Sequence, residues 1–256
     1  MNRLSLYVRG YSFFAPDYAT PADAFADVRR SATAPNFAMI EGRLRRFTSL
    51  VTQMHLDVAG EALRSANVAA SEVVSVFASS WGEITTAETI MRSIFDDGSV
   101  SAARFTQSVH NTPSGIFSIA ANNHRPSSTI AAGLQTCAMG FLEALTLQKD
   151  EGGDVLLTLA DEEIPSVFRA EVRPSLAVAF VLSEKSEGAH AKVSLIPAPK
   201  DGAPEEVRVL ENDTLPAHLR PSAVALGVAL VRFLAAKDVT PVTLRGASYA
   251  ILVEPA

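Results

Sequence analysis

Apolar positions along the chain follow two kinds of spacing, and each predicts a different element. Short runs of apolar and β-branched residues predict strands over 4–14, 73–79, 128–132, 154–159, 176–182, 191–196 and 242–253, the last as one strand or a hairpin. Apolar residues spaced three and four apart predict helices over 20–30, 49–66, 85–95, 135–148, 223–236 and the second half of 105–121. Strands and helices therefore alternate along most of the chain.

This alternation predicts an α/β layered fold in which a mixed sheet is covered by helices. Residues 34–46 carry no regular spacing and are expected to form a loop. Residues 197–215 are rich in Pro, Gly and acids, so we expect a loop or an insertion there. We expect residues 1–256 to form a single domain, since this length suits one large core.

Composition and charge narrow the classes of partner. The chain has 256 residues and a net charge of −6, which gives no general attraction to nucleic acid. It has a single cysteine, so an internal disulfide is excluded and a cytoplasmic location is expected. The most apolar stretch, 222–236, is too short to span a membrane, and the first residues lack the apolar core of a signal peptide.

Two stretches carry specific patterns. The first is 108–120, in which Asn111, Ser114, Gly115 and Ser118 fall within a Ser-Val-His-Asn…Ser-Gly…Ser-Ile-Ala run. The second is 126–144, a short buried strand, a tight turn and a helix. Both stretches and their spacing resemble the N-terminal half of β-ketoacyl synthases.

This resemblance implies a thiolase-like fold, of which the chain forms one ketosynthase N-terminal half. It also implies where the nucleophilic cysteine of the condensing enzymes stands, namely at the turn before the helix. In one register that place holds Leu134, and in a register one residue later it holds Gln135. Neither side chain forms an acyl-enzyme, and neither register reaches Cys137. The second half of a ketosynthase, which supplies further catalytic residues, has no counterpart in 256 residues. We therefore expect a non-catalytic subunit without a cofactor.

The chain is more similar to the short, one-domain ketosynthase-like proteins found beside aryl polyene and related clusters. These proteins are chain-length-factor-like partners of a complete ketosynthase that works on an acyl carrier protein. The resemblance implies that a full-length β-ketoacyl synthase is the partner, in a heterodimer or heterotetramer. It also implies that residues near the 85–95 helix set chain length, with Trp81, Thr85, Thr89 and Met91 as candidates; ordinary core or surface contacts are the alternative.

The resemblance further implies a dimer interface at the strand before the turn. Interface candidates are His110, Asn111, Ser114, Phe117, Ser127, Ser128, Thr129, Ile130, Ala131 and Ala132. An unpaired apolar strand invites pairing with another chain, so this strand gives a physical reason to expect a partner or a homodimer. For His110, a structural role with its ring bonded to the backbone is the alternative.

Charged residues give one candidate docking patch. Arg43, Arg45 and Arg46 form a compact basic cluster, which either docks an acidic acyl carrier protein or is a solvated loop. The acidic run 161–163 is expected to be exposed and without a catalytic role. No pair of histidines has metal-ligand spacing, so no metal is expected.

Two other functions stay open at this level. A stand-alone acyltransferase or thioesterase would use Cys137 near the start of the 135–148 helix, with the hydroxyl of Thr136 as a weaker candidate. The alternative for Cys137 is a small buried residue of the core. The third possibility is a homodimer that binds an acyl chain or an acyl carrier protein.

Overall fold

The computed structural model describes residues 4–36, 39–40, 44, 48–168, 173–197, 208–210, 214–237, 240–245 and 249–256. Its helices are α1 (Pro21–Ala26), α2 (Leu50–Ala66), α3 (Ile84–Asp97), α4 (Ala102–Phe105), α5 (Thr112–Ala121), α6 (Thr136–Glu151) and α7 (Ala225–Ala235). Its strands are β1 (Ser5–Phe14), β2 (Val74–Ala78), β3 (Ser127–Ile130), β4 (Val155–Asp161), β5 (Leu176–Ser183), β6 (Ala191–Pro197), β7 (Arg208–Leu210), β8 (Val242–Arg245) and β9 (Tyr249–Pro255).

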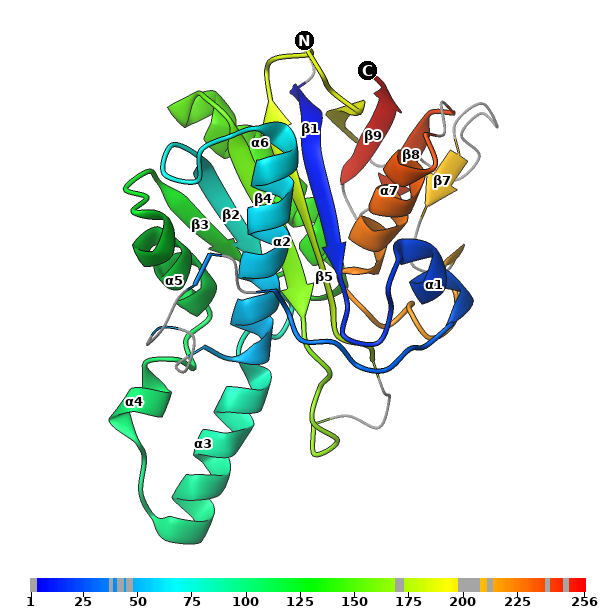
Figure 1. The fold of residues 1–256 in the computed structure, drawn as a ribbon. Coiled ribbons are helices and arrows are strands. Elements are labelled where there is room, and N and C mark those ends of the chain that lie inside the picture. The colour runs from blue at the N-terminus through cyan, green and yellow to red at the C-terminus, as the bar shows by residue number, and fades with distance from the viewer. Residues whose placement is uncertain are drawn as a thin grey trace.

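The strands form one nine-stranded sheet in the order β3-β2-β4-β5-β1-β6-β9-β8-β7. Strands β3, β2 and β4 run parallel to one another, and the pairs from β4 through β9 to β8 are antiparallel. Helices cover both faces of this sheet, as Figure 1 shows. The expected α/β fold, a mixed sheet between helices, is confirmed.

The central strands β2, β4 and β5 are mostly apolar and buried along their whole length because both of their faces are covered. In β5, Val178 and Phe180 point to the face covered by α6 and α7, whereas Ala179 and Val181 point to the face covered by α2. All eight residues of this strand are buried. The period of two between the faces therefore separates two apolar clusters on opposite sides of one sheet.

Helix α2 begins where the sequence predicts it, for a local reason. The Ser49 hydroxyl accepts a hydrogen bond from the Thr52 backbone N–H at 3.1 Å, which satisfies one donor of the first turn. The helix ends at Asn67, which adopts a left-handed conformation with φ of 53°. Helix α1 begins in the same way at Thr20, but it ends at Ala26 rather than near residue 30.

Three further expectations change in detail. The 242–253 segment forms a hairpin, with β8 antiparallel to β9. Within the expected loop 197–215, β7 adds a parallel strand beside β8. The mixed 105–121 segment separates into α4 and α5.

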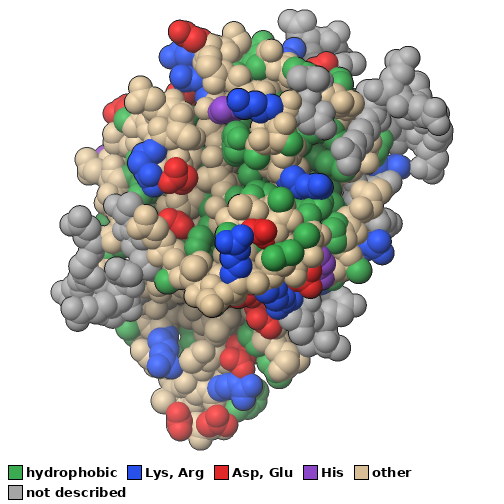
Figure 2. Space-filling model, turned by 45° about the vertical axis from the view of Figure 1, so that its right-hand side comes forward, with side chains coloured by type: hydrophobic (Ala, Val, Ile, Leu, Met, Phe, Trp, Pro, Cys, Tyr) green, Lys and Arg blue, Asp and Glu red, His purple; other side chains and the backbone are tan. Residues whose placement is uncertain are grey.

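Figure 2 shows acidic and basic side chains interspersed over the visible face, which accords with the modest net charge of −6.

Candidate functional site

The turn between β3 and α6 is held by a single hydroxyl. Thr136 Oγ1 donates to the Gly133 carbonyl at 2.6 Å and accepts from the Ala132 backbone N–H at 3.1 Å. Gly133 adopts φ of 54°, a left-handed conformation that favours glycine. Thr136 is fully buried within the turn, so its hydroxyl is structural and is not placed to act as a nucleophile.

Leu134 lies on the short 3₁₀ turn Gly133–Gln135 and is 44% exposed. Leu134 lines a cavity of about 520 Å³, and residues from three other segments line it as well. These are Ser80 and Trp81 after β2, Arg173 before β5, and the 217–221 segment before α7. The cavity therefore lies beyond the carboxyl ends of the parallel strands, which is where open α/β sheets bind ligands.

A buried carboxylate fixes the segment that carries Trp81. Asp161 accepts hydrogen bonds from the Ser79 hydroxyl at 2.7 Å, the Ser80 N–H at 2.8 Å and the Trp81 N–H at 3.2 Å. Burial raises the pKa of Asp161 to about 6, against the opposing effects of these hydrogen bonds and of the Arg173 charge. The carboxylate thus fixes the backbone of the Ser79–Trp81 segment, which forms one wall of the cavity.

Two more buried acids hold the base of α3. Glu162 accepts the Thr85 backbone N–H at 3.0 Å, and burial raises its pKa to about 7. Glu83 accepts the Thr52 hydroxyl at 2.5 Å and, like Glu162, has a pKa raised mainly by burial. The expectation that residues 161–163 are exposed was therefore wrong for the first two. Strand β4 continues through Asp161, and its end lies under the segment between β2 and α3.

His110 stabilises the same segment. Its Nε2 lies 3.0 Å from the Ser79 carbonyl oxygen, to which the ring N–H donates. Beside it, Gly82 adopts φ of 55°, and a Cβ there would lie 2.8 Å from His110 Cδ2. The half-buried ring thus packs against a backbone position that only glycine fills without strain. This contact matches the alternative for His110, a structural role with its ring bonded to the backbone.

Helix α5 turns two of the expected interface residues into the core. Phe117 is 1% exposed, and its ring centroid lies 5.5 Å from that of Phe77 on β2. Ser114 is also buried, and its hydroxyl donates to the Asn111 carbonyl at 2.9 Å. The expectation that Ser114 and Phe117 lie at an interface is therefore corrected, because their face of α5 packs on the sheet. Asn111 is exposed.

Strand β3 lies at one end of the described sheet and pairs only with β2 among the residues that the structure describes. Ser127 is exposed, and Ser128, Thr129 and Ile130 are half-buried. The strand ends at Ile130, so Ala131, which is exposed, and Ala132, which is half-buried, lie in the turn that follows it. These positions leave a strand edge open next to the cavity.

Helix α3 projects from the body of the molecule together with α4, as the lower part of Figure 1 shows. Ile90 is the only residue of α3 that is buried, while Phe95 is 86% exposed. Met91 is exposed on this helix, and Thr89 donates its hydroxyl to the Thr85 carbonyl. Thr85 lines a second cavity, of about 620 Å³, beside Glu162 and not the cavity of Trp81 and Leu134.

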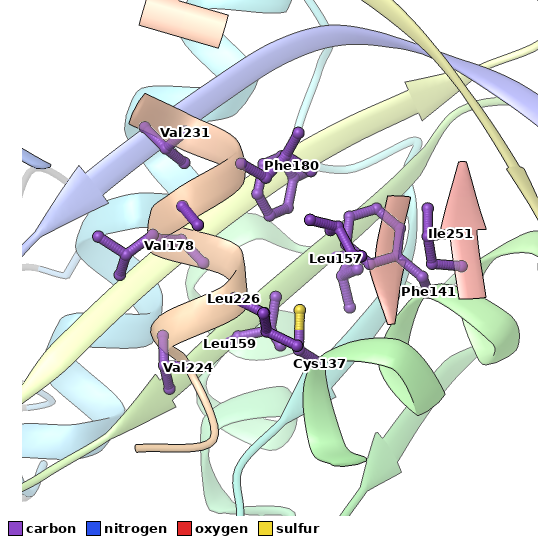
Figure 3. Close-up of a cluster of buried hydrophobic side chains, with 14 of the residues drawn as sticks. Cys137, Phe141, Leu157, Leu159, Val178, Phe180, Val224, Leu226, Val231 and Ile251 are labelled. Atoms are coloured by element: carbon purple, nitrogen blue, oxygen red, sulfur yellow. The ribbon is translucent and has the colours of Figure 1, made fainter. Parts of the chain in front are cut away.

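Cys137 lies in the first turn of α6 but points into the core. Figure 3 shows its sulfur among Leu159, Leu226 and other apolar side chains. The residue is 1% exposed, and burial raises the pKa of its thiol to about 12. This thiol is neither ionised near neutral pH nor accessible. Of the two alternatives for Cys137, the structure therefore favours a small buried residue of the core.

Three further expectations concern the basic cluster, a metal site and a membrane span. The basic cluster Arg43, Arg45 and Arg46 lies outside the described residues. No group of three or more His, Cys, Asp or Glu side chains is arranged for a metal ion within the described part of the chain. No described helix is long and apolar enough to cross a membrane. Sequence reasoning did not single out Arg173, Arg220 or Glu83, and it named Asp161 and Glu162 only as members of an acidic run expected to be exposed. The signal that could have marked these two acids is their place directly after an apolar strand.

Structural comparison gives neighbours that cover nearly the whole chain. A chain from the complex of the ketosynthase ApeO with its chain length factor ApeC, from Xenorhabdus doucetiae, is 19% identical, with a TM-score of 0.67 over 98% of this chain and 99% of that one. A chain of the ishigamide ketosynthase/chain length factor is 13% identical, with a TM-score of 0.71 over 97% and 98%. The AntDE:AntF complex, of a type II acyl carrier protein with its ketosynthase bound to the hexaketide, gives 12% identity and a TM-score of 0.71 over all of both chains. These likenesses show that the fold is that of ketosynthases.

Sequence comparison assigns the family directly. No curated protein matches the chain. The profile of the family described as "Beta-ketoacyl synthase, N-terminal domain" matches residues 20–238, which is most of the chain and includes the β3–α6 turn. The protein is therefore a member of the β-ketoacyl synthase N-terminal domain family.

Proposed function

We propose that this protein is a non-catalytic, chain-length-factor-type subunit that pairs with a full-length β-ketoacyl synthase. In this role it shapes the partner's acyl pocket during polyene, polyketide or fatty-acid-like synthesis on an acyl carrier protein. The single observation that carries the proposal is the side chain at the turn. Leu134, which one register of the family resemblance puts at the nucleophile, lines the cavity, and Gln135, which the other register puts there, follows it on the same 3₁₀ turn; neither side chain attacks a thioester.

Neither Cys137 nor Thr136 offers a substitute nucleophile at this turn. The Cys137 thiol is buried in the core with its pKa raised to about 12, and the Thr136 hydroxyl is engaged within the turn. These facts argue against a stand-alone acyltransferase or thioesterase built on either residue. The single continuous sheet supports the expectation that residues 1–256 act as one domain.

Strand β3 supports pairing as the way in which the partner is held. Its neighbour β2 donates to the carbonyls of Pro126 and Ile130, so these groups face the sheet. Because backbone groups alternate along a strand, the N–H and carbonyl of Thr129 face away from β2. An open edge of this kind is a template for another strand. The exposed apolar residues of α3, among them Phe95, lie on the part of the molecule that projects from its body, where they are accessible to a second molecule.

The experiment is co-purification from the native cells, followed by native mass spectrometry. We expect a complete ketosynthase in equal amount with the tagged chain. The variant Thr129→Pro removes the outward-facing N–H together with the threonine side chain, and it is expected to reduce the recovered partner at least about tenfold. The matched control Thr129→Val also changes the side chain but keeps the N–H, and it is expected to retain the partner. Recovery of the chain alone, as a monomer or as a homodimer, would refute the proposal.

A further inference from the structure

Helix α3 is attached to the body of the molecule mainly through its first turn. The helix packs mainly on α4 and not on the sheet, and Ile90 is its only buried residue. Both helices project from the body, as the lower part of Figure 1 shows. Residues 79–86, which lead into α3, lie against the body instead, and Glu83 at the N-cap is only 2% exposed. We call residues 79–86 the α3 joint, because what holds them decides how firmly the α3–α4 projection is seated.

Three buried carboxyl groups hold the α3 joint. Asp161 accepts two of its backbone N–H groups, just after β2, at 2.8 and 3.2 Å. Glu162 accepts the Thr85 N–H at 3.0 Å, and Glu83 accepts the hydroxyl of Thr52, in the first turn of α2, at 2.5 Å. Each of the three acids is at most 6% exposed. The seating of the projection therefore depends on carboxyl groups that the fold keeps away from water.

Glu162 faces other acids. Its pKa is about 7, raised first by burial and then by the charges of Glu83 and Asp161. The hydrogen bond from the start of α3 lowers the pKa, and the positive end of the helix dipole acts in the same direction. The cavity of about 620 Å³ beside Glu162 is lined by the carboxylates of Asp17 and Glu163, and no Lys, Arg or His is among its described lining residues. Ionisation of Glu162 therefore adds a like charge to an acidic surrounding.

Two cations act on the other acids of the α3 joint. A charge on His110 lowers the pKa of Glu83, although burial raises that pKa overall. Arg173 acts in the same way on Asp161, whose pKa burial still raises to about 6. His55 on α2 is uncharged, because burial lowers its pKa to about 3. In all three acids the effect of burial prevails, so ionisation opposes the closed arrangement.

We propose that the α3 joint is a proton-controlled hinge, which seats the α3–α4 projection while its three acids are protonated and releases it when they ionise. An acid whose pKa is raised in the folded structure contributes stability at low pH, and this stability is lost as the pH rises through the raised value. Release is therefore expected as the pH rises through about 6 and 7. The opening is local, because few apolar contacts hold α3 to the body. This inference goes beyond the proposed pairing, because it concerns a motion of this chain alone.

Hydrogen–deuterium exchange followed by mass spectrometry measures the opening in the full-length protein. Protection factors of peptides from 84–97 are compared at about pH 6 and about pH 8.5, after correction for the intrinsic exchange rate at each pH. A carboxyl group with a pKa of about 7 in the closed joint and about 4.3 in water shifts the opening equilibrium about tenfold over this interval. We therefore expect the protection of α3 to fall at least about tenfold, and to lie below that of α7 at both pH values.

Variants link this change to the joint. Glu162→Gln keeps an oxygen that accepts the Thr85 N–H but does not titrate, so the fall in α3 protection is expected to be about tenfold smaller than in the wild type. The matched control is Glu163→Gln, which changes the exposed neighbour and is expected to reproduce the wild type. Glu83→Gln is the second variant, and it is expected to reduce the fall in the same direction as Glu162→Gln.

Three results would overturn the inference. The first is an α3 protection that is the same at both pH values. The second is a fall of equal size in the wild type, Glu162→Gln and Glu83→Gln. The third is equal protection of α3 and α7, which would mean that α3 opens only when the whole protein unfolds. None of these results depends on whether a ketosynthase purifies with the chain, so the hinge and the pairing are tested separately.

Discussion

Replacement of Asp161 by asparagine removes the charge that the backbone N–H groups of Ser80 and Trp81 enclose. The carboxyl has a pKa of about 6 in the folded protein and about 3.9 in an unfolded chain, so its ionisation opposes folding. Stability from this group is fully present below the unfolded pKa and is lost as the pH rises through about 6. The full loss corresponds to about 3 kcal/mol, of which about 1.4 kcal/mol falls between pH 5 and pH 8.

The Asp161→Asn variant keeps an oxygen that accepts the three hydrogen bonds but does not titrate. We therefore expect the decline in unfolding free energy between pH 5 and pH 8 to be about 1.4 kcal/mol smaller in the variant than in the wild type. Urea unfolding followed by circular dichroism at the two pH values measures this difference. Glu162 titrates in the same window, but it contributes to both proteins and largely cancels in the comparison.

The control is Asp150→Asn, which changes an exposed carboxylate at the end of α6. It is expected to reproduce the pH dependence of the wild type. The reasoning is refuted if Asp161→Asn loses stability between pH 5 and pH 8 by as much as the wild type does. Such a result would mean that the Asp161 carboxylate is solvated or already fully compensated in the folded protein, with its pKa near the ordinary value.

Two further predictions concern buried side chains. Cys137 is expected to react with iodoacetamide at pH 8 only after unfolding, because its thiol is inaccessible and its pKa is raised to about 12; rapid labelling of the folded protein, followed by mass spectrometry, would contradict this. Phe117→Ala is expected to cost about 3–5 kcal/mol in urea unfolding, since it empties space against Phe77, whereas Ile119→Ala on the exposed face of α5 is expected to cost under about 1 kcal/mol. Similar costs for both variants would show that α5 does not pack as described.

The elements that the sequence predicts well are those whose signal is local. Helix α2 has a serine cap and a left-handed residue at its end, and both are readable in the chain. Strands β4 and β5 are mostly apolar, with no alternation of polar residues, which marks a strand buried on both faces. Strand β7 has only three residues and depends on β8 as its neighbour, so no local pattern distinguishes it from the loop in which it was expected.

The candidate site divides in the same way. The β3–α6 turn is local, so the sequence predicted the turn and the helix after it, and burial decides for Cys137 in favour of the core residue that was one of its two readings. The acids after β4 could not be assigned from their own neighbours, because acidic runs are normally exposed. Their burial is decided by a segment about 80 residues earlier in the chain, whose backbone N–H groups Asp161 accepts.

The charge of Asp161 has a cost that its place beside the Trp81 segment explains. A buried carboxylate whose pKa is raised carries a cost to folding near neutral pH, so Asp161 is not present for stability alone. Asp161 holds Trp81 through its backbone N–H, and Trp81 in turn lines a cavity that is also lined by Arg173. If the cavity were a remnant without a role, an uncharged residue at 161 would stabilise the fold and leave function unchanged. The cost is tied to position, because the three donors that Asp161 accepts fix the segment that forms this wall.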